Sequence, residues 1–122
     1  MARRIDALAG RAALTAWRAG QTDRATVRTA VRFTLAEFAD VAPGHSVEVR
    51  VPPAGVVQAV EGPRHTRGTP PNTVETDPPT WLALVTGRQS WADAVACGAV
   101  RASGERADLS AWLPLQAARD RG

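Results

Sequence analysis

The residues best suited to binding chemistry lie between positions 64 and 69, in the order Arg-His-Thr-Arg-Gly-Thr. The guanidinium groups of Arg64 and Arg67 can form charge-assisted hydrogen bonds with carboxylate or phosphate oxygens. The Thr hydroxyls and the backbone amides beside Gly68 add further donors. This segment therefore predicts a site for an anionic head group. The alternative is a solvated loop in which the arginines pair with nearby carboxylates such as Glu75.

The remaining polar residues do not form a catalytic or metal-binding pattern. His45 and His65 lie in unlike loops and lack the spacing of metal ligands. Ser103 precedes a glycine without the Gly-x-Ser-x-Gly frame of a hydrolase nucleophile, and no Gly-rich phosphate loop is present. Cys97 has no basic neighbour in the sequence that would activate it, so we expect a buried structural thiol. We expect no enzyme activity, no bound metal and no cofactor.

A second candidate site is an apolar pocket between the predicted sheet and the C-terminal helices. Sites for hydrophobic ligands are concave and mostly apolar, and three tryptophans at helix positions facing strand valines would line such a site. The residues assigned to this pocket are Trp81, Val85, Trp91, Val95, Trp112, Leu113 and Val56. The alternative is that the three rings fill the core and leave no room for a ligand.

Two helices are predicted in the first third of the chain, where apolar residues recur every three or four positions. The first ends near Gly20, which suits the position after a helix. Its apolar stripe consists of Ile5, Leu8, Ala12, Ala16 and Ala19, with Leu14 and Trp17 nearby. Thr22 or Asp23 caps the second helix, which ends near residues 40–42. The stripe of this second helix consists of Val27, Val31, Leu35 and Phe38.

The rest of the chain alternates between short strands and short helices. Strands are predicted at residues 46–51, 56–60 and 99–103, with a brief one at 73–76 and the first two antiparallel. Asp77 caps a helix that begins at Pro78, and Ser90 with Asp93 resembles a capping box for the next helix. Asp108 caps a final short helix that carries Leu109, Trp112 and Leu113.

These elements predict an α+β fold, in which a mostly antiparallel, twisted sheet is covered by N-terminal and C-terminal helices. A chain of 122 residues is long enough for one hydrophobic core. We expect one domain over residues 1–122, with a helical part at 1–42, the sheet and C-terminal helices at 45–115, and a frayed tail at 116–122.

The amino-acid composition limits the kinds of partner molecule that we expect for this protein. All fifteen basic residues are arginines and the net charge is +3, but no basic stripe is interleaved with aromatic residues. We therefore expect no nucleic-acid partner. No segment approaches the roughly 20 apolar residues of a membrane span, so we expect no stable membrane insertion. A single cysteine fits a reducing compartment, and we expect a cytoplasmic protein.

The order of features from Asp77 onward resembles the C-terminal half of a sterol-carrier-protein type 2 domain. The shared pattern is an acid, an apolar helix, a Gly-basic step, a helix ending in Gly, a strand, a Gly-acid step and a Leu-rich segment. This chain supplies Asp77, Trp81 to Leu84, Gly87-Arg88, Ala94-Val95, Gly98, Val100 to Ser103, Gly104-Glu105 and Leu109 to Leu113. The resemblance extends back to about Val47. The segments SVEVRVPP and RASGERADLS are further similar to small actinobacterial sterol carrier family proteins.

The resemblance implies a sterol-carrier-type fold with an apolar ligand tunnel. It implies non-catalytic carriage of a hydrophobic small molecule or lipid, such as a fatty acid or an acyl-CoA. One alternative is a ligand-free interaction module, in which the amphipathic N-terminal helices dock on a partner or pair two copies as a homodimer. Another is an accessory domain of a thiol-dependent isomerase, because a related domain occurs in mycothiol-dependent maleylpyruvate isomerases. Their zinc site lies in a separate His-rich domain and is not implied for this chain.

Overall fold

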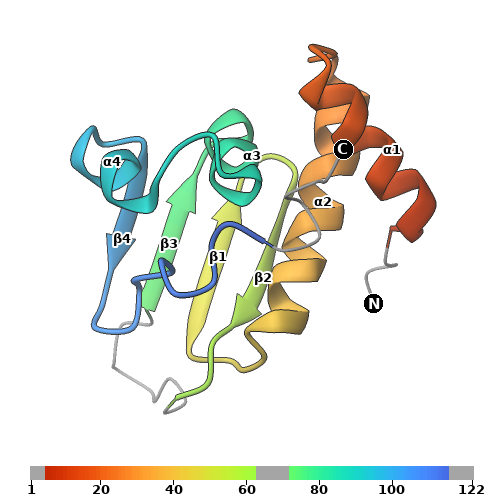
Figure 1. The fold of residues 1–122 in the computed structure, drawn as a ribbon. Helices are drawn as coiled ribbons and strands as arrows, with labels where there is room; N and C mark the ends of the chain where they lie inside the picture. Colours follow the sequence, from red (N-terminus) through yellow and green to blue (C-terminus); the bar gives the residue numbers. More distant parts are fainter. Residues whose placement is uncertain (1–4, 63–71, 116–122) are drawn as a thin grey trace.

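The computed structural model describes residues 5–62 and 72–115. Its centre is a four-stranded sheet in the order β2-β1-β3-β4 (Figure 1). The strands are β1 (Val47–Val51), β2 (Gly55–Ala59), β3 (Asn72–Thr76) and β4 (Val100–Ser103). The β1–β2 and β3–β4 pairs are antiparallel, whereas β1 and β3 run parallel. The predicted α+β fold with a mostly antiparallel sheet is thus confirmed.

Helices pack around this sheet. They are α1 (Ala7–Arg18), α2 (Arg24–Val41), α3 (Pro78–Thr86) and α4 (Trp91–Ala96). In Figure 1, α2 lies next to β2 with α1 on its other side, and α3 and α4 lie at the end of the sheet where β1 and β3 finish. No helix in the described part of the chain is long and apolar enough to cross a membrane.

The helix starts are fixed by local hydrogen bonds, as the sequence predicts. The side chain of Asp23 accepts the backbone N–H of Thr26 at 3.1 Å, and Asp77 accepts that of Thr80 at 2.9 Å. Ser90 accepts the N–H of Asp93 at 3.0 Å. Each contact satisfies one of the N–H groups that a helix start leaves unpaired. The predicted caps at Asp23, Asp77 and Ser90 are therefore confirmed.

The apolar face predicted for the first helix is wrong. Its buried residues are Gly10, Ala13, Leu14 and Trp17. Leu8, which belongs to the predicted stripe, is 76% exposed. The reason is the close approach of α1 to Phe33 on α2: a Cβ on Gly10 would lie only 2.3 Å from the Cγ atom of that ring. Only glycine leaves room for the ring at this position, and this contact sets the rotation of α1.

The apolar face predicted for the second helix is correct in its central part. Val31, Leu35 and Phe38 are buried, and Phe38 meets the ring of Trp81 edge-to-face at a centroid distance of 5.7 Å. The indole N–H of Trp81 donates to the hydroxyl of Thr34 at 2.9 Å, inside the core. This face of α2 is covered by the rest of the same chain, so it is not free to dock a partner or a second copy.

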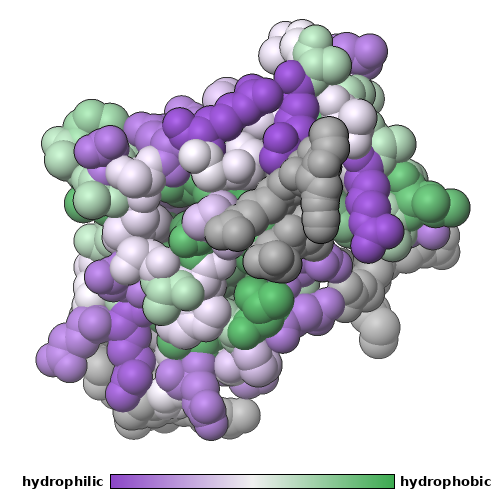
Figure 2. Space-filling model, viewed as in Figure 1, coloured by the Kyte–Doolittle hydropathy of each residue, from purple (hydrophilic) through white to green (hydrophobic). Residues whose placement is uncertain are grey.

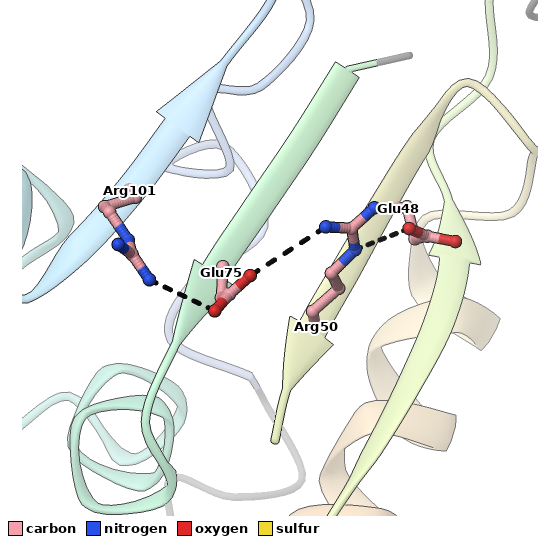
Figure 3. A network of polar contacts seen from close by, with 4 residues as sticks. All are labelled: Glu48, Arg50, Glu75 and Arg101. Atoms are coloured by element: carbon pink, nitrogen blue, oxygen red, sulfur yellow. Dashed lines mark hydrogen bonds and ion pairs between the residues drawn. The ribbon is translucent and has the colours of Figure 1, made fainter. Parts of the chain in front are cut away.

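The face of the sheet that points away from the core carries charged residues from three strands. Figure 3 shows Glu75 on β3 between Arg50 on β1 and Arg101 on β4, at N–O distances of 3.9 and 3.1 Å. Arg50 also contacts Glu48 of its own strand at 2.6 Å. Alternation along β1 explains this, because its valines are buried while Glu48 and Arg50 point the other way.

The final short helix predicted at Leu109 to Leu113 is wrong, because this segment forms a turn. Within the turn the N–H of Trp112 donates to the carbonyl of Leu109 at 3.0 Å. Asp108 acts as a cap, but for the turn, and its carboxylate accepts the N–H of Ser110 at 2.9 Å. Pro114 disfavours a helical conformation at the residue before it, so no second helical turn can follow. The predicted tail at 116–122 lies outside the described residues.

Candidate functional site

Some residues predicted to line an apolar pocket are buried in the core, some are partly buried against it, and some are exposed. Trp81 and Val85 are fully buried in the core, and Trp91, Trp112 and Leu113 are partly buried against it. Phe38 brings two of the rings together, because Trp112 also meets it edge-to-face, at 6.2 Å. Near the centre of the face shown in Figure 2, hydrophobic residues reach the surface among hydrophilic ones. A ligand-binding role for this cluster stays a prediction.

The remaining predicted site residues are not part of this cluster. Val56 does not face the tryptophans, because it is the register partner of Arg50 and lies on the outer face of the sheet, 54% exposed. Val95 is 41% exposed on α4. Arg64 and Arg67 lie outside the described residues, so the predicted anion site in that loop stays a prediction.

A groove of about 680 Å³ opens at another place in the fold. It is bounded by the end of α1, the start of α2, the turn between β1 and β2, and the start of α3. The residues that line it are Trp17, Thr22, Arg24, Val27, Arg28, Pro53, Ala54, Pro78 and Pro79. Six of these nine are apolar, and the volume falls within the roughly 300–1,000 Å³ of small-molecule sites.

The apolar wall of the groove is held rigidly. The ring of Trp17 is largely buried, and the guanidinium of Arg88 covers it at 4.7 Å from the ring centroid. Arg88 also donates to the backbone carbonyl of Arg18 at 3.1 Å, which ties the end of α1 to the loop after α3. Pro78 and Pro79, opposite, begin α3 with a fixed backbone angle. A ligand would meet side chains that are already ordered.

The polar side of the groove is cationic. Arg24 and Arg28 lie one helical turn apart on α2, and both are exposed. Among the described residues, no Asp or Glu lines the groove. Beside the groove, hydrogen bonds from the side chain and backbone of Thr26 lower the pKa of Asp23 from its ordinary value of 3.8, so this carboxylate is committed to capping the helix. The arrangement suits binding of a molecule with an apolar part.

Sequence reasoning missed this groove. It correctly predicted Pro53 as a turn residue and Pro78 as a helix start, and it placed Val27 on the apolar face of its helix, where this side chain is only partly buried. The groove exists only where four segments meet. One signal in the sequence pointed to it, namely that Trp17 lies off the stripe predicted for the first helix.

Cys97 and His45, considered from the sequence as a possible nucleophile and a possible metal ligand, do not come together in one site. Cys97 is exposed, which corrects the predicted buried thiol, and its Sγ atom donates to the carbonyl of Ala94 at 3.6 Å. The thiol lies just after the end of α4, at the position that caps the helix. His45 is exposed, with its Nδ1 atom 2.9 Å from the side-chain oxygen of Gln58. Across residues 5–62 and 72–115, no three His, Cys, Asp or Glu residues are grouped to hold a metal ion.

Comparison with known families gives a match over most of the chain. The family model described as bacterial SCP ortholog matches residues 23–115, which include all four strands and every helix except α1. A search of the curated proteins finds no match. The family model covers well over half of the chain, in the region where the sequence resembles a sterol-carrier-protein domain. The chain therefore belongs to the family of bacterial SCP orthologs.

Proposed function

We propose that the protein binds and carries a hydrophobic small molecule or lipid without changing it chemically, and that the apolar part of this ligand lies in the groove. The observation that carries the proposal is the apolar lining that four segments build in a member of an SCP-like family. Fatty acids, acyl-CoA and other lipids all have such a part. The described lining of the groove shares no residue with the predicted pocket, in which Trp81 and Val85 are buried.

Affinity in such a site comes from removing apolar surface from water. Burial contributes about 25 cal/mol per Å², so covering roughly 300 Å² of ligand would contribute about 7 kcal/mol before the costs of association. Those costs are lower where the protein side is already ordered. Two parts of the groove meet this condition. One is the ring of Trp17, which the guanidinium of Arg88 covers, and the other is the set of prolines in α3 and in the β1–β2 turn.

The lining favours binding over catalysis. General acid–base and covalent catalysis use His, Cys, Asp, Glu or an activated Ser or Lys. The groove presents Trp, Val, Pro and Ala side chains together with one Thr and two Arg. These groups bind and orient a ligand, and none of them is paired with a base that would activate it.

The experiment is a titration with the neutral fluorescent probe N-phenyl-1-naphthylamine, combined with native mass spectrometry of the purified protein. Ala54→Trp should fill the groove and weaken probe binding by at least tenfold. Val56→Trp is the matched control: it adds the same side chain two residues away, on the outer face of the sheet, and should leave binding unchanged. Unchanged binding in Ala54→Trp, or no binding to the unmodified protein, would refute the proposal.

The cluster under the C-terminal segment is the second location to test for the same ligand. It is favoured by the partly exposed apolar side chains of Trp112 and Leu113. A ligand bound there would be retained by Ala54→Trp and lost from Leu113→Asn. The two variants thus distinguish the groove from the predicted pocket.

A further inference from the structure

The charged side chains of helix α2 are arranged unfavourably with respect to the helix dipole. Arg24, Arg28 and Arg32 occupy its first half, whereas Glu37 and Asp40 lie near its end. The first turn contains no acid and the last turn no base. The helix dipole favours the opposite arrangement, with acids near the start and bases near the end. Interaction with the helix dipole therefore does not account for the arginines in the first half of α2.

The first two of these arginines are not used in the fold. Within residues 5–62 and 72–115, neither Arg24 nor Arg28 forms an ion pair or a hydrogen bond through its side chain. The arginines of the outer sheet face differ, because Arg50 and Arg101 both contact Glu75. Arg24 and Arg28 instead lie at the rim of the groove, where the described lining residues include no carboxylate.

We infer that the groove selects a ligand with an anionic head group, carboxylate or phosphate, and that Arg24 and Arg28 are the residues that select it. This inference rests on the proposed function of the groove. Side chains four residues apart on a helix are neighbours on its surface, so two guanidiniums can donate to the oxygens of one head group. The apolar chain of the ligand then lies against Trp17 and Pro78. A neutral alcohol offers one hydroxyl and compensates neither charge.

The structure supplies a matched control on the same helix. Arg32 lies one further turn along α2, is also exposed, and carries the same charge. It does not line the groove, and its stem lies near Gly55 at the start of β2. Arg32→Gln therefore removes the same charge from the same helix without altering the proposed head-group site.

The experiment measures calorimetric binding of dodecanoate, dodecyl phosphate and dodecanol, which share one chain length. Acetate and inorganic phosphate are the controls for a head group alone. Hydrogen bonds to charged groups predict that at least one anionic probe binds roughly 10- to 100-fold more tightly than dodecanol. Arg24→Gln and Arg28→Gln should each remove most of this difference and leave dodecanol binding unchanged. Arg32→Gln should leave all affinities unchanged, and acetate and phosphate should not bind measurably.

Two results would overturn the inference while the proposed function stands. One is equal affinity for dodecanol and both anionic probes. The other is an equal loss in Arg32→Gln and Arg24→Gln, which would show an effect of net charge alone. If none of the three twelve-carbon probes binds, the proposed function itself fails. The tighter of dodecanoate and dodecyl phosphate identifies the head group, and circular dichroism of each variant confirms that it is folded.

Discussion

Replacing Thr34 by Val should destabilise the protein, because it removes the hydroxyl that accepts the indole N–H of Trp81. Both side chains are completely buried, and the donor and acceptor atoms are 2.9 Å apart. Valine has nearly the same shape as threonine, so the core is neither emptied nor overfilled. The main consequence is a buried N–H group without a partner, at the contact between α2 and α3.

The size of the effect follows from that orphaned donor. A buried donor left unsatisfied costs about 1–3 kcal/mol. The hydroxyl of Thr34 also donates to the carbonyl of Ala30 at 2.8 Å, within its own helix. We therefore expect a loss of about 2 kcal/mol in the free energy of unfolding, and a melting temperature lower by about 6–10 °C for a chain of this size.

Thr86→Val is the matched control. Thr86 is also a buried helix threonine whose hydroxyl donates to a carbonyl four residues earlier, that of Leu82, at 2.6 Å. Within residues 5–62 and 72–115, no side chain donates to it, so its replacement should cost less than about 1 kcal/mol. The assay is urea unfolding followed by circular dichroism. Equal losses in the two variants, or an undiminished effect of Thr34→Val in a Trp81→Phe background, would refute the reasoning.

Three further predictions concern other contacts. Gly10→Ala should cost about 1–3 kcal/mol in urea unfolding, because its Cβ would meet the ring of Phe33 at 2.3 Å. Asp23→Asn should flatten the stability profile at low pH. The pKa of Asp23 is lowered on folding, so its contribution is present above about pH 4 and is lost as the pH falls through the folded value, as acid titrations of unfolding would show. Arg88→Ala should cost about 0.5–1 kcal/mol and change the fluorescence of Trp17, whose ring it covers at 4.7 Å.

Each of these predictions has a result that contradicts it. Helix propensity alone would make Gly10→Ala stabilising by about 1 kcal/mol, so unchanged or raised stability in this variant would remove the special role of Gly10. An acid profile of Asp23→Asn that overlays the unmodified protein would show that another carboxylate governs it. Unchanged Trp17 emission in Arg88→Ala would show that the guanidinium does not rest on that ring.

Much of the secondary structure could be predicted because it depends on neighbours in the sequence. A side-chain cap reaches three residues along the chain, so Asp23, Asp77 and Ser90 could be identified without the fold. The alternation of valines with polar residues in β1 likewise assigns its buried face. The turn at residues 109–113 could not be predicted from its cap alone, because Asp108 caps a turn and a helix in the same way.

The buried face of a helix or strand was predicted well only where the sequence places apolar residues on one side and polar residues on the other. Val56 and Val57 are both apolar, so alternation cannot say which of them is buried, and only pairing with β1 turns Val56 outward. The rotation of α1 depends on Phe33 of another helix fitting over Gly10. Both answers depend on residues that are distant in the chain.

The sequence by itself determined the family, the α+β class and the starts of α2, α3 and α4, because these follow from local hydrogen bonds and from the order of motifs. Only the tertiary structure decided that β3 lies inside the sheet, parallel to β1. It alone placed Trp17, Arg24, Ala54 and Pro78 around one groove. The physical reason is that a concave surface is made by packing between elements, and the spacing of residues within one element does not encode which others it will meet.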